Sequence, residues 1–386
     1  MTSVKLEDIA LVNPRQHRGL EDDHEIAFLG MADVSEQGRT SEGSLRPYAE
    51  VRKGYTAFED RDLLVAKITP CFENGKIAQA ELQRQIGFGS TEFHVVRPKP
   101  DSVDHRYLLH FLRSPRVRVA GERQMTGSAG QKRVPADFLR RLEIPLPRLP
   151  EQRRIAAILD EADALRAKRR TQLERLALLR SAAFSSHFGL PDRDNSVTIG
   201  DLLESTQYGT SSKAAESGDL PVLRMGNITT DGRLDLTDMK YVPAEEARGD
   251  RYLVKRGEIL FNRTNSAELV GKTALYDEAE PRAFAGYLVR MRPKTAEDGP
   301  FIAGYLNSRH GKAVLRGMAK SIVGQANINA KEAQSIRVPI ASGSAKRAYA
   351  DAVKLIDEQR RSVEVGLDAL NSLFASLQSR AFRGEL

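Results

Sequence analysis

The tripeptide Gly271-Lys272-Thr273 resembles the end of a phosphate-binding loop and raises the question of nucleotide binding. Such a loop needs a glycine-rich turn whose backbone N–H groups wrap the phosphates, with another glycine five residues before the Gly-Lys pair. That position is Ser266, and the residues between contain no glycine. A nucleotide-dependent enzyme built on Lys272 is therefore the weakest interpretation of this sequence.

Other groups that could carry catalysis are poorly placed for it. Asp192 and Asp194 lie in a linker, and the acidic run at 21–25 (EDDHE) is typical of a solvated loop. No Cys/His set has zinc spacing, and the single cysteine, Cys71, excludes an internal disulfide. Residues 13–15 (NPR) lack the second proline of the loop with which DNA amino-methyltransferases hold a flipped base. The sequence predicts no active site, no cofactor and no bound metal.

Side chains that could contact DNA occur in two groups. Arg, Lys, Asn and Gln make hydrogen bonds to base edges, and Lys and Arg also neutralise phosphates. In the second half of the chain the candidates are Tyr208, Lys213, Arg224, Asn227, Arg263, Asn265, Lys272, Lys320 and Gln325. In the first half they are Lys67, Thr69, Asn74, Lys76, Arg116, Arg118, Gln131 and Lys132. Each alone also suits a surface or turn residue, so the prediction depends on the whole set.

Positive charge is concentrated in two matching stretches. Between residues 106 and 133 seven Lys and Arg residues accompany one acidic residue, Glu122. The stretch 305–337 holds six basic residues and only Glu332 as an acid. Solvated surfaces usually mix both signs, whereas one-sided charge favours phosphate contact. Since the chain also carries a net charge of +7, double-stranded DNA is the predicted partner.

The candidates lie in a unit that occurs twice in the chain. Residues 62–69 (DLLVAKIT) match 258–265 (EILFNRTN), and 75–78 (GKIA) match 271–274 (GKTA), each pair 196 positions apart. An internal repeat of this kind predicts two domains of the same fold.

The duplication gives the Gly-Lys pair a simpler interpretation. Gly271-Lys272 recurs as Gly75-Lys76, followed by Ile77 in place of the hydroxyl residue that a phosphate-binding loop uses on magnesium. Each pair is therefore predicted to mark the turn of a repeated hairpin. The glycine would supply a left-handed backbone angle, and the lysine would be exposed and free to meet a phosphate.

Each copy of the unit ends in a long predicted helix, over residues 150–189 and 344–386. Apolar residues recur there at alternating spacings of three and four, which is typical of a coiled-coil seam. The predicted pairing residues are Ile155, Ile158, Leu165, Leu176 and Leu179 in the first helix, and Val353, Ile356, Val363, Leu370, Phe374 and Leu377 in the second. A helix of about 37 residues within such a range is about 55 Å long. We expect the two helices to pair and to act as a spacer.

The predicted fold is α+β, with two similar mixed α/β domains at residues 1–149 and 190–343. They are separated by the two long antiparallel helices, which form a coiled coil. The N-terminus has no basic run followed by an apolar core, and no apolar stretch reaches membrane-spanning length. These features favour a cytoplasmic protein with no membrane partner.

This organisation and three local stretches resemble the specificity (S) subunit of type I restriction-modification systems. The stretches are 220–236 (LPVLRMGNITTDGRLDL), 256–276 (RGEILFNRTNSAELVGKTALY) and the helix entry that ends at 149–153 (LPEQR). The resemblance covers essentially the whole chain. It departs locally at Arg148, where many members have a second proline after the residue equivalent to Pro147.

The resemblance implies two target recognition domains, each reading one half of a bipartite DNA site, with paired helices that set the gap between the halves. It also implies two methyltransferase (M) subunits and restriction/translocase (R) subunits as partners that carry the catalytic activities. The chain itself would not be an enzyme. The alternative is a stand-alone, duplicated DNA-binding regulator, which would bind tightly and specifically without companion subunits.

Overall fold

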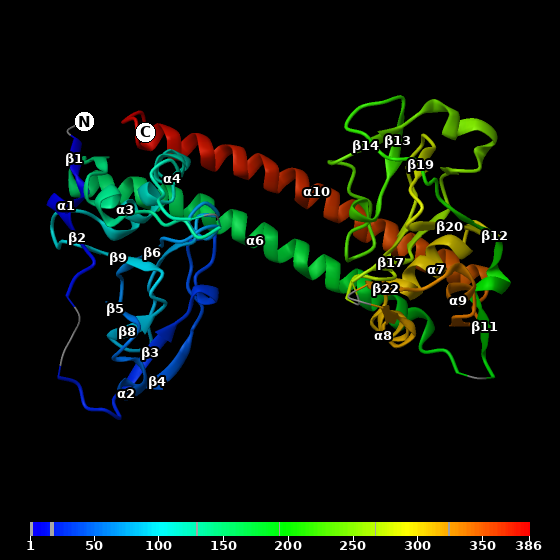
Figure 1. The fold of residues 1–386 in the computed structure, drawn as a ribbon, viewed down its shortest axis with the longest axis horizontal. Helices are drawn as coiled ribbons and strands as arrows, with labels where there is room; N and C mark the ends of the chain where they lie inside the picture. Colours follow the sequence, from blue (N-terminus) through cyan, green and yellow to red (C-terminus); the bar gives the residue numbers. More distant parts are fainter. Residues whose placement is uncertain (1–2, 16–18, 129, 193, 267, 323–324) are drawn as a thin grey trace. The chain divides into compact units, whose positions relative to one another are not determined.

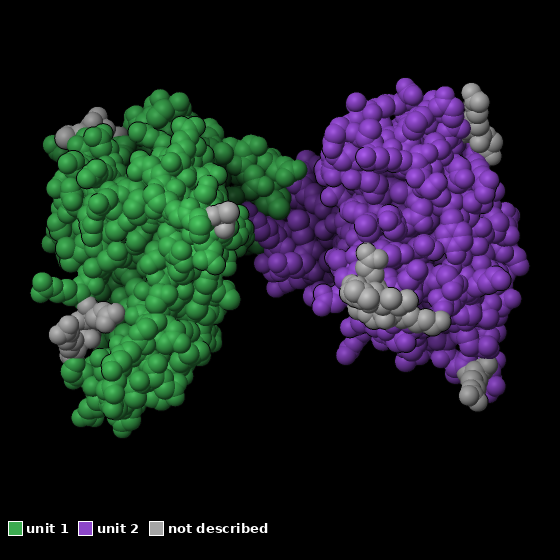
Figure 2. Space-filling model, viewed as in Figure 1, with its two compact units in different colours: residues 1–168, 366–386 green, residues 169–365 purple. Residues whose placement is uncertain are grey.

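The computed structural model describes residues 3–386 except 16–18, 129, 193, 267 and 323–324. The chain divides into two compact units, whose elements are labelled in Figure 1 and whose surfaces are coloured in Figure 2. Unit 1 contains residues 1–168 and 366–386, and unit 2 contains residues 169–365. Each unit therefore has part of both long helices, and we call the rest of each unit its head.

The head of unit 1 is built on two four-stranded sheets. One has the order β2-β9-β6-β7 and is antiparallel, and the other has the order β4-β3-β8-β5 with β3 and β8 parallel. A separate antiparallel pair joins β1 to β10. The strands are β1 (Ser3–Lys5), β2 (Ala10–Val12), β3 (Glu25–Leu29), β4 (Ser44–Pro47), β5 (Thr56–Glu59), β6 (Leu63–Ala66), β7 (Ile77–Gln79), β8 (Ile86–Gly89), β9 (Phe93–Pro98) and β10 (Glu143–Pro145). The helical elements are α1 (Leu6–Ile9), η1 (Met31–Asp33), α2 (Tyr48–Val51), α3 (His105–Leu112), α4 (Pro115–Glu122) and α5 (Ala136–Arg140).

The head of unit 2 repeats this topology. Its two four-stranded sheets have the orders β12-β20-β16-β18 and β14-β13-β19-β15, and β11 pairs with β23. A three-stranded sheet, β17-β22-β21, completes it. The strands are β11 (Ser196–Thr198), β12 (Leu203–Tyr208), β13 (Leu220–Leu223), β14 (Lys240–Val242), β15 (Leu253–Val254), β16 (Ile259–Asn262), β17 (Thr264–Asn265), β18 (Thr273–Leu275), β19 (Arg282–Phe284), β20 (Leu288–Pro293), β21 (Lys320–Ile322), β22 (Gln325–Asn327) and β23 (Arg337–Pro339). The helical elements are η2 (Ile199–Leu202), η3 (Met225–Asn227), η4 (Ala244–Asp250), α7 (Asp298–Asn307), α8 (Arg309–Met318) and α9 (Ala330–Gln334).

The matched segments that revealed the repeat form the central strands of both heads. β6 and β16 are buried along their whole length, as expected for continuous apolar runs covered on both faces. Each strand pairs with two neighbours: Leu63 lies opposite Val96 of β9 and Gln79 of β7, and Ile259 lies opposite Met291 of β20 and Leu275 of β18. The expected α+β fold, with two similar mixed domains, is confirmed.

The two long helices are α6 (Leu149–Phe188) and α10 (Gly343–Ala381). Inside unit 1, Arg166 Nε donates to Asn371 Oδ1 at 2.9 Å. Inside unit 2, Arg180 Nε lies 3.0 Å from Asp357 Oδ1, and Arg360 Nη1 donates to the carbonyl of Leu173 at 3.5 Å. Because rising positions on α6 meet falling positions on α10, the helices pair antiparallel, as expected. No helix in the described part of the chain is long and apolar enough to span a membrane.

The predicted seam has the wrong phase on α6. Leu165 and Leu179 are 39% and 53% exposed, whereas Leu159 and Phe184, one residue away in phase, are 0% and 2% exposed. Ile155 is buried, and Ile158 and Leu176 are half-buried at the edge of the packed face. The spacing of apolar residues predicted the wrong packed face because the inner face of α6 is partly charged. Asp163, Arg166 and Arg180 occupy it and are paired by hydrogen bonds and ion pairs.

On α10 the predicted positions lie on the packed face. Val363 and Phe374 are buried. Val353, Ile356, Leu370 and Leu377 are half-buried. In unit 1 the residue that follows this helix also completes the core of the head, since Phe382 packs edge-on against Tyr107 and Phe111, with ring centroids 5.4 and 5.2 Å apart.

Candidate nucleic-acid interface

The two hairpin lysines form hydrogen bonds inside their own heads and do not extend into solvent. Lys76 Nζ donates to the carbonyl of Met31 at 3.0 Å, and Lys272 Nζ donates to the carbonyls of Met225, at 3.0 Å, and Ile228. Burial lowers the pKa of Lys272. The expectation of exposed lysines is therefore wrong, because each ammonium group satisfies carbonyls of the short helical turn η1 or η3. The glycines beside them do adopt left-handed angles, with φ of 76° at Gly75 and 80° at Gly271.

The basic stretch of unit 1 is also partly committed to the fold. Arg106 pairs with Asp160 at 2.5 Å, and Arg133 pairs with Glu92 at 2.8 Å. Arg118 Nη1 donates to the carbonyl of Glu73 at 3.3 Å. The positive charge available for phosphates is therefore smaller than the sequence count indicates. The predicted contacts of this head that stay exposed are Asn74, Arg116, Gln131 and Lys132, and Arg123 of the basic stretch is exposed too.

Other candidates, in this head and in the three-stranded sheet of unit 2, are hydrogen-bonded or half-buried, or their side chains lie outside the described part of the structure. Thr69 Oγ1 donates to Glu73 Oε1 at 2.7 Å, and Asn265 Oδ1 accepts from the backbone of Ser266 at 2.9 Å. Lys67 is half-buried. The side chains of Lys320 and Gln325, at the starts of β21 and β22, lie outside the described part of the structure.

Unit 2 brings four of the predicted residues together around one cleft of about 870 Å³. They come from segments far apart in the chain: Lys213 follows β12, Arg224 precedes η3, Asn227 is the last residue of η3, and Arg263 follows β16. The rest of the lining is Thr210, Ser211, Ser212, Ala214, Met225, Gly226, Asp235, Asp238, Ala285, Gly286 and Tyr287. A cleft of this size with cationic side chains in its walls can accept a segment of a polyanion.

Two of these four side chains are already engaged. The guanidinium of Arg224 pairs with Asp238 at 2.8 Å. Asn227 is 3% exposed, and its amide nitrogen donates to the carbonyls of Asp235 and Asp238 at 2.8 and 3.0 Å. Its oxygen accepts from the backbone N–H of Arg224 at 2.9 Å. Asn227 is therefore a buried cap of η3, and the expectation that its amide is free to read adenine is wrong.

Sequence reasoning missed Tyr287 and Met225, which line the same cleft and are 53% and 37% exposed. Tyr287 lies between β19 and β20, directly after Ala285 and Gly286. A tyrosine next to a glycine in a turn was the available signal, since an aromatic side chain there has no strand neighbour to cover it.

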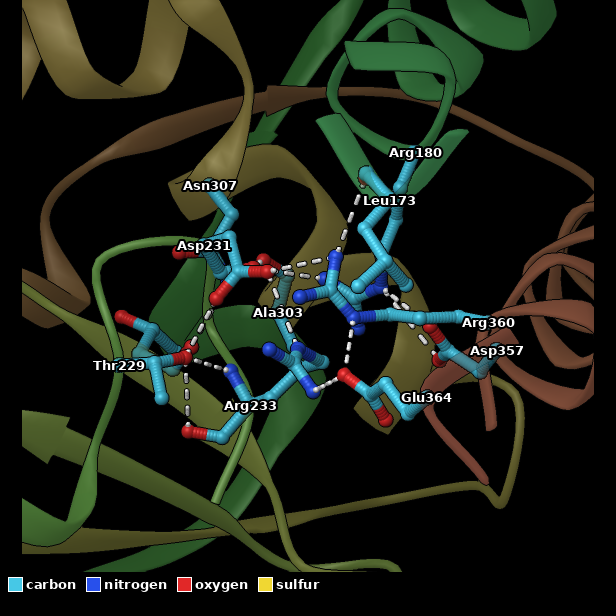
Figure 3. Close-up of polar contacts among 11 residues, drawn as sticks. Leu173, Arg180, Thr229, Asp231, Arg233, Ala303, Asn307, Asp357, Arg360 and Glu364 are labelled. Carbon is cyan, nitrogen blue, oxygen red and sulfur yellow. Dashed lines mark hydrogen bonds and ion pairs between the residues drawn. The ribbon is translucent and has the colours of Figure 1, made fainter. Parts of the chain in front are cut away.

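A charged network ties the head of unit 2 to both long helices (Figure 3). Glu364 of α10 accepts from Arg360 at 3.0 Å and from Arg233 of the 229–233 turn at 3.2 Å. Arg180 of α6 donates to the carbonyl of Asp231 in the same turn at 3.0 Å. Burial alone would raise the pKa of Asp231, but hydrogen bonds from Thr229 and Arg233 hold it below its usual value. The network fixes the turn, and with it β13 and η3, against the helices.

Comparison with known proteins gives a family model and several relatives. The family described as "Type I restriction modification DNA specificity domain" matches residues 1–175. The EcoAI specificity subunit of Escherichia coli is 46% identical over 149 residues, which cover 38% of this chain and 25% of that protein. The EcoKI specificity subunit of Escherichia coli K12 is 26% identical over 342 residues, which cover 81% of this chain and 72% of that protein. The chain thus spans only about a quarter of the length of the first of these relatives.

Solved structures agree on the fold. The S subunit of a type I restriction-modification system from M. genitalium superposes with a TM-score of 0.58, at 17% identity, over 99% of this chain and 96% of its own. A chain from a structural study of type I system assembly and conformational transition gives a TM-score of 0.60 at 18% identity, over 100% of this chain and 98% of its own.

Proposed function

Residues 1–175 belong to the DNA specificity domain family of type I restriction-modification systems, which confirms the resemblance seen in the sequence, and from this premise we propose a role for the whole chain. It is a non-catalytic subunit that recognises DNA and serves as a scaffold. The domain at residues 1–149 reads one half of a bipartite site, and the domain at 190–343 reads the other. The helices at 150–189 and 344–386 set the spacer and bind M subunits.

The observation that carries this proposal is the duplication of one sheet topology on a shared pair of helices. The sheets of unit 1 have the orders β2-β9-β6-β7 and β4-β3-β8-β5, and unit 2 repeats them as β12-β20-β16-β18 and β14-β13-β19-β15. Both units contain part of α6 and part of α10. Two readers of the same construction but different surface residues suit a site with two unlike halves. A single enzyme domain would need no such repetition.

The outer faces of the long helices support the role as a scaffold. On α6, Leu165, Leu178 and Leu179 are 39%, 71% and 53% exposed. On α10, Leu355, Val365 and Leu373 are 63%, 71% and 48% exposed. Contiguous patches of exposed apolar side chains mark surfaces that protein partners cover, and we take these residues as parts of such patches. We assign these faces to the M subunits, while R subunits join the complex through the assembled enzyme.

The test is to co-express the chain with its M subunit and to map methylated adenines across the host genome. A single motif made of two short specified parts and an unspecified gap supports the proposal. Gel-shift measurements at fixed salt, with and without the M subunit, separate it from the alternative. A stand-alone regulator would bind its site tightly alone and would produce no methylated motif.

The spacer role has its own test. Four residues inserted in the middle of α6 lengthen the helix by about 6 Å, close to two base-pair rises. The gap in the methylated motif should then grow while both specified parts stay the same. A motif with changed parts and an unchanged gap would contradict this role of the helix.

A further inference from the structure

The cleft of unit 2 contains a guanidinium group that makes no ion pair with the described residues. Arg263 lines the cleft, and its Nε, like that of Arg224, is buried without a hydrogen-bond partner in the described part of the structure. Among the described residues no carboxylate lies within ion-pair distance of it, whereas Arg224 in the same cleft pairs with Asp238. A buried donor without a partner costs stability, and because Arg263 lines an open cleft, a ligand in that cleft can supply acceptors to its guanidinium group.

The structure holds this guanidinium in place. Its central carbon lies 5.1 Å from the ring centroid of Tyr208, and the hydroxyl of Tyr208 accepts the backbone N–H of Ala330 at 3.1 Å. The backbone of Arg263 is fixed on both sides. Its N–H donates to the carbonyl of Tyr287 at 3.1 Å, and its carbonyl accepts from Ile328 at 2.9 Å. The side chain is thus half-buried and stacked, and its orientation is set before any ligand arrives.

The acceptor must be compatible with the rest of the cleft. Its two carboxylates are satisfied, Asp238 by Arg224 and Asp235 by the hydroxyl and backbone of Thr237. The cations left for a ligand are Arg263 and the exposed Lys213. The exposed ring of Tyr287 adds an apolar surface at the same cleft. A planar, electron-rich ligand group with two neighbouring hydrogen-bond acceptors fits these walls better than a charged side chain of another protein.

We propose that Arg263 determines the specificity of the second domain by donating two hydrogen bonds to the O6 and N7 atoms of a guanine. This inference rests on the proposed function, since it names the base class that one half of the DNA site must contain. A guanidinium presents two parallel donors in a fixed fork, which matches the two acceptors on the major-groove edge of guanine. Flexible, exposed cations such as Lys213 serve the phosphates instead.

The first head places a different cation at the same point. Lys67 donates its N–H to the carbonyl of Glu92 at 2.9 Å, and its carbonyl accepts from Val134 at 2.8 Å, as Arg263 does with Tyr287 and Ile328. An ammonium group has no fork and selects a base edge less strictly. The backbone position is therefore shared by both heads, and the forked donor belongs to the second.

The experiment uses the complex of this chain with its M subunit and compares wild type, Arg263→Lys and Arg263→Gln by genome-wide mapping of methylated adenines. Arg256→Ala is the matched control, because Arg256 is an exposed arginine of the same head that pairs with Asp277 at 2.9 Å outside the cleft. We expect both Arg263 variants to lose roughly 10- to 100-fold discrimination at one G·C position of one half-site. The other half-site, the gap and the control motif should not change.

Several outcomes would overturn the inference. One is a wild-type half-site without a G·C pair at the affected position, and another is an unchanged motif in both variants. A third is equal weakening on all sequences with a smaller salt dependence, which would make Arg263 a phosphate contact. Circular dichroism melting of each variant identifies loss of folding, and Arg263→Lys keeps the charge and stem if Arg263→Gln does not fold. Failure of the proposed function is distinct, since wild type would then give no bipartite motif.

Discussion

The two heads have one scaffold but fasten the same turn to the long helices by different chemistry. In unit 2 the turn at 229–233 supplies two charged side chains, Asp231 to Arg360 and Arg233 to Glu364. It also supplies the backbone carbonyl of Asp231 to Arg180. In unit 1 the turn at 35–39 supplies a backbone carbonyl, that of Glu36, at 3.2 Å to Arg113, the residue that follows α3. Arg113 in turn faces Asp163 of α6 at 3.5 Å. The position of the turn is therefore retained in both heads, while the side chains that fix it have diverged.

The hairpin lysines show the opposite pattern. Lys76 and Lys272 make the same contact with the carbonyls of η1 and η3 in both heads. What both heads share thus serves the fold, whereas what differs between them, such as Lys67 and Arg263, is where different DNA sequences can be read. The following predictions test that division.

The largest effect is expected from Phe184→Ala in unit 2. Phe184 is 2% exposed, and its ring lies 5.3 to 5.6 Å from those of Phe301, Tyr305 and Tyr349. Truncation should lower the free energy of unfolding by about 3–5 kcal/mol. Hydrogen exchange should accelerate in β16 of unit 2 and change little in β6 of unit 1.

Leu355→Ala, at a 63% exposed position of α10, is the control and should shift stability by less than about 0.5 kcal/mol. Equal acceleration in β6 and β16 after Phe184→Ala would show that the two heads unfold as one body, and the comparison between them would lose its basis.

Arg360→Met should cost about 1–3 kcal/mol, because it removes one of the two cations, Arg360 and Arg233, that pair with both Glu364 and Asp231 in a half-buried network. Urea denaturation measures the loss, and hydrogen exchange should quicken at the 229–233 turn. The matched variant in unit 1 is Arg166→Met, which removes the contacts to Asp163 and Asn371. It should leave hydrogen exchange at the 229–233 turn unchanged. A turn in unit 2 that stays protected after Arg360→Met would rule out the network as its anchor.

The hairpin lysines should give two similar, smaller effects. Lys76→Met and Lys272→Met each remove donors from carbonyls of a helical turn, and each should cost about 1–2 kcal/mol. Thermal melting compares the two variants directly. If either variant kept full stability and lost DNA affinity instead, its lysine would be a phosphate contact after all.

The smallest effect concerns acid and Asp160 of unit 1. Burial alone would raise the pKa of this carboxyl, but hydrogen bonds from His110, at 2.7 Å, and Arg106 hold it well below its usual value. A pKa lower in the folded than in the unfolded state stabilises the fold above about pH 4, and this contribution is lost as the pH falls further. Urea denaturation between about pH 5 and 2 should therefore show a shallower loss in Asp160→Asn than in wild type. Identical slopes would contradict the assignment.

Much of this architecture was predictable from the sequence, because duplication and heptad spacing are periodic signals. The central strands, the long helices and the phase of α10 all follow from apolar residues at regular intervals. The phase of α6 did not, since Asp163, Arg166 and Arg180 lie on its inner face, where only their partners make them tolerable. Charged residues on a packed face carry no apolar signal.

The candidate site was harder to predict for a related reason. Its walls come from segments around Lys213, Arg224, Arg263 and Tyr287, which only the folded sheets bring together. Asn227 and Lys272 have the residue types of DNA contacts, yet backbone carbonyls nearby engage both of them. Residue type shows what a side chain can bind, and only the fold shows whether it is free to do so.

The central claim is that each duplicated domain reads its own half of the DNA site. The most direct measurement is to replace residues 1–149 with the corresponding domain of another specificity subunit, keep α6 and α10, and map methylated adenines in cells that express the hybrid with the M subunit. We predict a motif in which one half changes while the other half and the gap stay the same. A motif in which both halves change would contradict independent reading by the two domains.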